Sequence, residues 1–332
     1  MTDATCRALV VSSPGSVSLE VRKPPLPRPG EVVVSPSVVG LCGTDLEIVD
    51  GLIDPAYVRY PIVLGHEWCG LLDGREGSKR VVVAEGVVPC GHCLRCRQGR
   101  TNLCETYDEL GFTRDGAASD EVAVPHELVH VLDDSVDKAA AALVEPAAVV
   151  YQGLQRAAPK PGWRMLVIGD GTVGLLTALV ARLWSPAVVD VVGVRDAQRE
   201  LALAVGADSF RSPDDRRRHE YDLVVEAAGS SSAAALALDS VRRGGVVVLI
   251  GLPPHGETTP VAVADIVNRD LSVHASFSYT SSAFGKVASL LNAGAIELSL
   301  LVTHRFALEE WPKALEVLRG PVGTRGKVVL EI

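Results

Sequence analysis

The sequence predicts an α/β protein of two domains, a β-rich N-terminal domain and a doubly wound parallel-sheet domain. Residues 1–40 alternate short β-branched runs with Pro and Gly, which is typical of strands joined by turns. From residue 165 onward, apolar runs of strand length alternate with Ala- and Leu-rich helical stretches, as in βαβ units. The 332 residues suffice for two domains of ordinary size.

The predicted elements follow in chain order. Strand-like runs of the N-terminal domain are 8–11, 32–34 and 38–39, and a helical stretch covers 137–158. The Pro-Lys-Pro-Gly segment at 159–162 interrupts the pattern, so we expect residues 1–150 to form the first domain and 151–276 the second.

Five apolar runs predict the parallel sheet of the second domain: 165–168, 188–192, 223–225, 246–250 and 271–273, with a helix at 175–183. Residues 277–332 then predict a helix at 282–293, a strand-like run at 301–306, a helix at 308–318 and a strand at 327–332. We expect this last segment to complete the first domain.

Composition and charge exclude several classes of protein. The formal net charge of −9 provides no basic surface for nucleic acid. No stretch approaches the ~18 apolar residues that span a bilayer, and the N-terminus does not resemble a secretory signal, so we expect a cytoplasmic protein without membrane contact. Seven cysteines, four of them between residues 90 and 104, favour metal ligation over disulfides and a reducing compartment; Cys6 and Cys69 receive no role.

A dinucleotide site is predicted at residues 169–174, which read Gly-Asp-Gly-Thr-Val-Gly between a predicted strand and a predicted helix. In this G-x-G-x-x-G pattern the glycines permit a tight turn and a close approach of pyrophosphate to the N–H groups at the helix N-terminus. The candidate cofactor contacts are Gly169, Gly171, Thr172, Val173 and Gly174, together with Ala228 and Gly251 further along the domain.

The residues after the second strand of this domain indicate which cofactor binds. An Asp or Glu at its end would accept a hydrogen bond from the ribose 2′-hydroxyl of NAD, whereas residues 193–196 read Gly-Val-Arg-Asp. Gly193 followed by Arg195 fits a 2′-phosphate, so NADP is favoured. NAD is the alternative, with Asp190 or Asp196 binding the ribose and Arg195 an ordinary loop residue.

Cys90, Cys93, Cys96 and Cys104 are spaced C-x2-C-x2-C-x7-C in a turn-rich segment. Four thiolates so close in sequence suit a closed tetrahedral zinc site of structural type. A nucleic-acid zinc ribbon fits less well because the flanking charge is mixed. His92 is expected to be exposed rather than a fifth ligand.

A second set of metal ligands is predicted from Cys42-Gly43-Thr44-Asp45 and Gly65-His66-Glu67. Cys and His are natural zinc ligands, and a catalytic zinc keeps one position open to water or substrate. Each motif alone is weak, since lone Cys and His residues are usually structural. Because the chain also has a predicted dinucleotide site and a separate four-cysteine segment, the two motifs together indicate a catalytic zinc site.

These segments, together with Glu145-Pro146 and the closing Gly326-Lys327-Val328-Val329, resemble the medium-chain dehydrogenase/reductase family of zinc alcohol, polyol and sugar dehydrogenases. The resemblance covers nearly the whole chain. It implies a GroES-like catalytic domain, a Rossmann domain for a nicotinamide dinucleotide, catalytic and structural Zn²⁺, and a homodimer or homotetramer.

The resemblance also implies site roles. Where alcohol dehydrogenases have a third sulfur ligand, this chain has Glu145, as in the sorbitol and glucose dehydrogenase branch, so the catalytic zinc ligands become Cys42, His66, Glu67 and Glu145. Whether both glutamates bind at once stays open. Asp45 is the candidate partner of the second nitrogen of His66, or else a turn cap, and Thr44 is the candidate proton relay.

The predicted reaction is hydride transfer between NADP(H) and a hydroxyl or carbonyl carbon of a polyol, sugar or aminocyclitol. The alternatives are an NAD-dependent secondary-alcohol or amino-alcohol dehydrogenase and a non-catalytic nucleotide-binding zinc protein. Glu47, Asp50 and Arg114 are candidate contacts of a small hydroxylated substrate, or else surface charges. Residues 116–120, Gly-Ala-Ala-Ser-Asp, lack an aromatic residue that is usual in the family.

Overall fold

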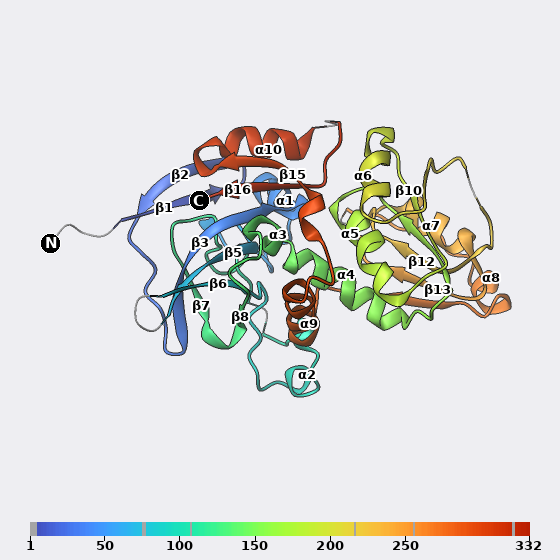
Figure 1. The fold of residues 1–332 in the computed structure, drawn as a ribbon, viewed down its shortest axis with the longest axis horizontal. Helices are drawn as coiled ribbons and strands as arrows, with labels where there is room; N and C mark the ends of the chain where they lie inside the picture. The colour runs from blue at the N-terminus through green and yellow to red at the C-terminus, as the bar shows by residue number, and fades with distance from the viewer. Residues whose placement is uncertain (1–4, 75–77, 107, 216, 255, 321–322) are drawn as a thin grey trace. The chain divides into compact units, whose positions relative to one another are not determined.

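The computed structural model describes residues 5–74, 78–106, 108–215, 217–254, 256–320 and 323–332 (Figure 1). The chain divides into two compact units. Unit 1 comprises Met1–Glu145, Thr280–Val322 and Lys327–Ile332, and unit 2 comprises Pro146–Tyr279 and Gly323–Gly326. The predicted ends at 150 and 276 lie within a few residues of this division, and residues 323–326 belong to unit 2 instead of unit 1.

Unit 1 is built from two β-sheets, with strand orders β2-β1-β4 and β15-β16-β3-β5-β6-β8, and β7 also pairs with β3. Its strands are β1 (Cys6–Ser13), β2 (Ser16–Arg22), β3 (Glu31–Leu41), β4 (Ile62–Val63), β5 (Glu67–Asp73), β6 (Lys79–Ala84), β7 (Val122–Pro125), β8 (Val129–Val131), β15 (Val302–Ala307) and β16 (Lys327–Glu331). The predicted runs 32–34 and 38–39 are a single strand, β3, whose register shifts between Pro36 and Val38 because Pro36 has no N–H to donate.

The helices that lie within unit 1 have four to twelve residues. They are α1 (Gly43–Asp50), α2 (Leu94–Arg97), α3 (Lys138–Ala142), α9 (Ser281–Asn292) and α10 (Trp311–Arg319), with 3₁₀ turns η2 (Thr101–Leu103), η3 (His126–Leu128), η6 (Leu298–Leu301) and η7 (Leu308–Glu310). The C-terminal segment completes the larger sheet because β16 pairs antiparallel with β3, placing Val329 opposite Gly40. Apolar side chains from both sheets and from α10 form one core, which includes Leu9, Val39 and Trp68.

Unit 2 is one parallel sheet of order β11-β10-β9-β12-β13-β14. Its strands are β9 (Arg164–Ile168), β10 (Val188–Val192), β11 (Ser209–Arg211), β12 (Tyr221–Glu226), β13 (Val241–Leu249) and β14 (Ser272–Ala275). Its helices are α5 (Thr172–Ala181), α6 (Arg199–Ala204), α7 (Ser231–Ser240) and α8 (Val263–Asn268). Two 3₁₀ turns are η4 (Arg182–Trp184) and η5 (Asp196–Gln198). α4 (Val144–Ala157) begins in unit 1 and continues into unit 2.

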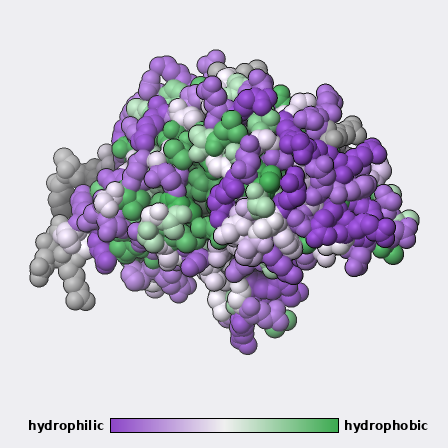
Figure 2. Space-filling model, turned by 45° about the vertical axis from the view of Figure 1, so that its right-hand side comes forward, coloured by the Kyte–Doolittle hydropathy of each residue, from purple (hydrophilic) through white to green (hydrophobic). Residues whose placement is uncertain are grey.

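This strand order confirms the predicted doubly wound fold. The chain runs outward from β9 to β11 and then reverses from β12 to β14, so the switch point lies between β9 and β12, where ligands bind in such sheets. Three residues of β11 are too few for the sequence pattern to have revealed that strand. The face of unit 2 that comes forward in Figure 2 is largely hydrophilic. Across the described ranges, no helix combines the length and apolar character needed to cross a bilayer.

Candidate active site

Cys42 lies at the junction between β3 and α1. It caps the N-terminus of α1, and its backbone N–H donates to Asp45 Oδ2 at 2.7 Å. Asp45 is fully buried, so this short turn is held from inside the domain and the direction of the Cys42 thiol is fixed. Cys42 and Thr44 are both half-buried, and the Cys42 Sγ lies 3.6 Å from Thr44 Oγ1.

His66 precedes β5 and is buried, with 4% of its surface exposed. Its Nδ1 lies 3.6 Å from Asp45 Oδ1, and neither atom has a hydrogen-bond partner within the described ranges. Burial alone lowers the pKa of His66, but the charge of Asp45 and contact with Cys42 raise it well above 6.5. Negative groups therefore surround an imidazole, an arrangement that suits a bound cation.

The donor atoms of Cys42, His66 and Glu67 all lie within 4.8 Å of one another. Ligands of a tetrahedral zinc ion stand about 3.3–3.8 Å apart, given zinc–ligand bonds of about 2.0–2.3 Å. Thiolate, imidazole and carboxylate are ligands that zinc accepts. This donor set therefore fits zinc, and the facing atoms Asp45 Oδ1 and His66 Nδ1 fit the contact through which a carboxylate orients a ligating imidazole.

Lys327, the first residue of β16, was not predicted as a site residue. Its Nζ lies 2.5 Å from Glu67 Oε2 and donates to the Leu41 carbonyl oxygen at 3.1 Å, and the side chains of Lys327 and Glu67 are 2% and 1% exposed. Gly40 makes room for this pair, because a Cβ there would lie 2.6 Å from Glu67 Oε2. Because lysines are rarely buried, the sequence offers no reason to expect Lys327 in the site. The pairing of β16 with β3 brings it there.

Glu145 is buried in the first turn of α4 but is not part of the compact three-ligand set. Burial raises the pKa of Glu145 to about 8, and although His66 lowers it, the charges of Glu67 and Glu109 raise it further. Glu109 is also buried and was not predicted as a site residue. Several acidic groups thus share this interior, a concentration of negative charge that a divalent cation would offset.

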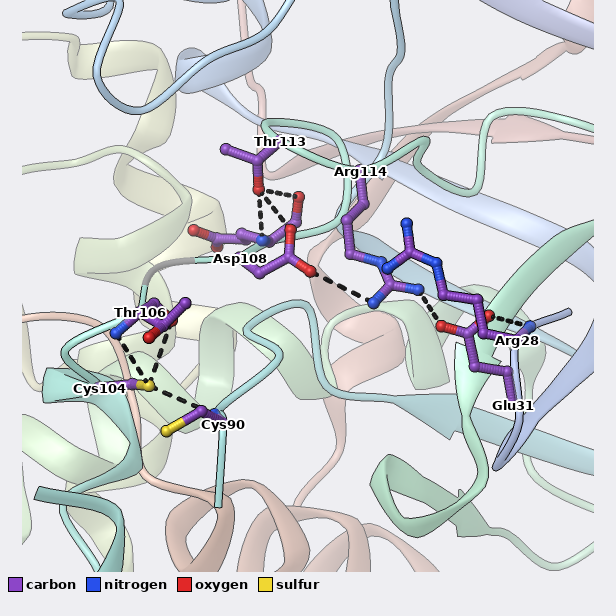
Figure 3. Close-up of polar contacts among 9 residues, drawn as sticks. Arg28, Glu31, Cys90, Cys104, Thr106, Asp108, Thr113 and Arg114 are labelled. Atoms are coloured by element: carbon purple, nitrogen blue, oxygen red, sulfur yellow. Dashed lines mark hydrogen bonds and ion pairs between the residues drawn. The ribbon is translucent and has the colours of Figure 1, made fainter. Parts of the chain in front are cut away.

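Two of the candidate substrate contacts are already ion-paired. Asp50 accepts two hydrogen bonds from Arg319. Arg114 bridges Glu31 and Asp108, and its Nη1 lies 3.3 Å from Asp108 Oδ2 (Figure 3). These side chains therefore pair with charged neighbours within unit 1. Glu47, the third candidate, is exposed.

The sulfur atoms of the four-cysteine segment also lie within 4.8 Å of one another. N–H groups of the loop point at the sulfurs: Cys93 N–H donates to Cys90 Sγ, and Cys96 N–H donates to Cys93 Sγ, both at 3.4 Å. Figure 3 shows Cys104 accepting in the same way from the N–H groups of Cys90 and Thr106. The Cys96 N–H is the main cause that lowers the pKa of Cys93 to about 6, as a metal-binding thiolate requires.

His92 is exposed, as predicted, and lies outside this sulfur cluster. Its Nδ1 is 2.7 Å from the Cys90 carbonyl oxygen. The four sulfurs therefore form a closed set without a nitrogen ligand, which fits a zinc ion of structural type.

The glycine-rich turn joins β9 to α5 in unit 2. A Cβ on Gly174 would lie 2.0 Å from the Gly169 carbonyl oxygen, so α5 packs against the turn without space for a side chain. At Gly171, in contrast, a Cβ would meet nothing within 4 Å, which leaves the space that a pyrophosphate needs.

Ala228 and Gly251 follow β12 and β13, so they lie at the same carboxyl edge of the sheet as the glycine-rich turn. The Ala228 N–H donates to the buried carboxylate of Glu226 at 2.7 Å. A Cβ on Gly251 would lie 2.3 Å from the Gly229 nitrogen. The predicted cofactor residues are thus brought together on one edge.

The two acidic alternatives for the ribose site have other partners. Asp190 is buried inside the sheet and accepts from Ser209 at 2.6 Å and Tyr221 at 2.7 Å. The exposed Asp196 pairs with Arg199. Arg195 donates through its side chain to Asp170, within the glycine-rich turn.

Comparisons with known proteins agree with this geometry. Residues 28–134 match the alcohol dehydrogenase GroES-like domain, and residues 172–293 match the zinc-binding dehydrogenase family. The chain is 31% identical to L-galactonate-5-dehydrogenase of Escherichia coli K12, over 91% of this chain and 92% of that protein. It is 30% identical to sorbitol dehydrogenase of Bacillus subtilis 168, over 93% and 92%.

Among solved structures, the fold is similar to a protein of Sinorhizobium meliloti 1021 described as a zinc-binding dehydrogenase bound to NADP. The TM-score is 0.92 and the identity 27%, and the match covers 99% of this chain and 100% of that one. The two domain matches, the full-length relatives and the clustered zinc donors lead to one assignment. The chain belongs to the zinc-dependent medium-chain dehydrogenase family and is an oxidoreductase of that family.

Proposed function

We propose that this dehydrogenase transfers a hydride between NADP(H) and a secondary hydroxyl or carbonyl carbon of a polyol, sugar or aminocyclitol. The observation that carries the proposal is the set of half-buried Cys42 with buried His66 and Glu67, whose donor atoms lie within 4.8 Å of one another. The relatives named for sorbitol and L-galactonate support a polyhydroxylated substrate.

Cys42, His66 and Glu67 would hold the catalytic zinc, with Glu145 as the candidate fourth ligand. Zinc, when bound, supplies a Lewis acid that lowers the pKa of the substrate hydroxyl, and the nicotinamide accepts the hydride. The residues of the chain supply orientation: Asp45 faces the Nδ1 side of His66 and also anchors the backbone of Cys42. His66 and Glu67 are buried, with 4% and 1% of their surfaces exposed, which limits the contact of these two side chains with water.

Thr44 is the candidate that receives the substrate proton. Its hydroxyl lies 3.6 Å from Cys42 Sγ, is half-buried, and can both accept and donate. We expect Thr44→Val to lower kcat by about 10²–10⁴-fold, the range of general acid–base catalysis. Thr44→Ser, which keeps the hydroxyl, should retain most of the activity. Equal activity in both variants, at unchanged zinc content, would reject the relay.

The substrate and the metal are tested on one preparation. Polyols, sugars, inositols, aminocyclitols and simple secondary alcohols are assayed with NADP and with NAD, and zinc is measured on the same sample. We expect about two zinc ions per chain and turnover confined to polyhydroxylated compounds. Turnover confined to simple alcohols or amino alcohols would instead establish the alternative dehydrogenase class.

The preference for NADP is supported by Gly193 and Arg195, which follow β10 where an NAD enzyme needs a carboxylate. Asp190 and Asp196, the acidic alternatives, have partners of their own: Asp190 accepts from Ser209 and Tyr221, and Asp196 pairs with Arg199. The test is Arg195→Ala, which should weaken NADP binding selectively. An equal change for NADP and NAD would reject the cofactor assignment.

We also propose that two copies assemble through the edge of the unit 2 sheet. β14 is the last strand in the order, and Val273 on it is 41% exposed. In α8, Val263 and Val267 are 67% and 71% exposed. Within the described residues β14 is an outermost strand, and such an edge together with exposed apolar side chains on α8 favours pairing with a second copy. Sedimentation should give a dimer or tetramer, and Val273→Lys should shift it toward the monomer.

A further inference from the structure

Four residues near the C-terminus, Gly323–Gly326, belong to unit 2. They form hydrogen bonds with residues at and near the predicted dinucleotide site. The Thr172 hydroxyl, at the start of α5, donates to the Gly326 carbonyl oxygen at 2.6 Å. The fully buried side chain of Gln198 donates to the Arg325 carbonyl oxygen and accepts from the Arg325 N–H, both at 2.7 Å. Arg325 is therefore fixed beside the glycine-rich turn.

Asp170, the second residue of that turn, fixes Arg195 from the other side. Its Oδ2 accepts from the Arg195 N–H at 2.8 Å, and its Oδ1 accepts from Nε and Nη2 at 3.1 and 2.9 Å. The Asp170 carbonyl oxygen accepts from both Arg195 Nη2, at 2.8 Å, and Gln198 Nε2, at 2.6 Å. One peptide group thus links Arg195 to the residue that holds Arg325.

Gly193 is required by the same arrangement. A Cβ at this position would lie 2.5 Å from the Cβ of Asp170 and 2.7 Å from the Phe210 ring. Gly193, the residue after β10, therefore makes room for the side chain of Asp170 and also leaves the ribose position without a carboxylate. Gly193 by itself therefore does not distinguish NADP from NAD, and the preference for NADP depends on the arginines.

Arg195, Arg325 and Asp170 together carry an excess of positive charge, two cations against one carboxylate. Burial lowers the pKa of Arg325, and the positive charge of Arg195 lowers it further, while Asp170 raises it. Arg325 thus lies near enough to Arg195 and Asp170 for both charges to act on it, and Arg195 is ion-paired with that carboxylate. A phosphate monoester carries about −1.5 to −2 charges at neutral pH, and arginine binds it through two parallel hydrogen bonds. Such a ligand would relieve the repulsion between the two arginines.

We propose that Arg325 is a second anchor for the adenosine 2′-phosphate of NADP, acting together with Arg195. The proposal rests on the proposed preference for NADP. The 2′-phosphate is favoured over the pyrophosphate because Arg195 follows β10, the strand whose end lies at the adenosine ribose in this fold. Asp170 and Gln198 act as positioning residues: Asp170 binds the guanidinium group of Arg195, and Gln198 binds the backbone of Arg325.

The test measures binding by titration calorimetry with four ligands: NADP, NAD, adenosine 2′,5′-bisphosphate and 5′-AMP. Arg325→Met should weaken NADP and the bisphosphate by about tenfold or more, as expected for a lost charge-assisted hydrogen bond, and leave NAD and 5′-AMP within about twofold. Arg325→Lys should recover part of the loss. Arg242→Met is the matched control, because Arg242 lies at the start of β13 on the opposite edge of the sheet and pairs with Asp222.

Equal weakening of NADP and NAD in Arg325→Met would overturn the proposal and assign Arg325 to the pyrophosphate. Unchanged binding of all four ligands would overturn it as well. Failure of the NADP preference itself has a different signature, since the unmodified protein would then bind NAD more tightly than NADP. The comparison of the bisphosphate with 5′-AMP would still decide whether Arg325 contacts a 2′-phosphate.

Discussion

The buried pair of Lys327 and Glu67 allows a sharp test of how the site is built. Lys327→Met keeps an unbranched side chain of similar length but removes the charge that lies 2.5 Å from Glu67 Oε2. In the metal-free protein, the carboxylate of Glu67 would then be buried without its partner. When zinc is bound, the ion itself compensates the carboxylate. The substitution should therefore destabilise the metal-free protein far more than the zinc-loaded protein.

The magnitude follows from the geometry. Two unit charges 2.5 Å apart attract by about 7 kcal/mol at an effective dielectric constant of about 20. Much of this is offset by the desolvation of both groups, and removal of one partner from a buried pair typically costs about 3–5 kcal/mol. For a domain of this size, that corresponds to a melting temperature lower by roughly 6–20 °C.

The assay is thermal and urea unfolding of four proteins, each with zinc and after chelation: the unmodified chain, Lys327→Met, Glu67→Gln and the double variant. The double variant should recover most of the loss, because replacing both partners removes the unpaired charge. Zinc should recover part of the loss in Lys327→Met. A metal-free Lys327→Met protein that melts within about 2 °C of the unmodified chain would refute the role of this ion pair, and so would single losses that add in the double variant.

Three further predictions concern other parts of the chain. Burial raises the pKa of Glu145 from 4.5 to about 8, so this carboxyl takes up a proton on folding. Its contribution to the free energy of unfolding is complete below about pH 4.5 and is lost as the pH rises through 8. Unfolding of the metal-free protein, measured from pH 5 to 9, should show this fall in stability. An equally steep fall in Glu145→Gln would contradict the prediction. Gly174→Ala should abolish dinucleotide binding in calorimetry, because the new Cβ would lie 2.0 Å from the Gly169 carbonyl oxygen; retained affinity would show that the turn can move. Cys93→Ser should remove one zinc ion per chain and expose residues 90–104 to proteolysis, whereas Cys42→Ser should remove the other zinc ion and leave that segment resistant.

Features whose residues lie close together in the chain could be predicted from the sequence alone. The four-cysteine segment and the glycine-rich turn are such features, since ligand spacing and strand-turn-helix punctuation are local properties. Alternating strand and helix patterns also predicted the doubly wound sheet that the strand order confirms. The short strand β11 was missed because three residues carry too little pattern.

Other parts of the site depend on segments that meet only after folding. Lys327 reaches Glu67 because β16 pairs with β3, and the two residues are 260 positions apart in the numbering. Arg195 was predicted as a phosphate contact, but its attachment to Asp170 and its proximity to Arg325 follow from how the turn, η5 and residues 323–326 pack. Periodicity and spacing report the preferences of neighbouring residues, whereas a buried charge finds its partner through packing between distant elements, which no local pattern encodes.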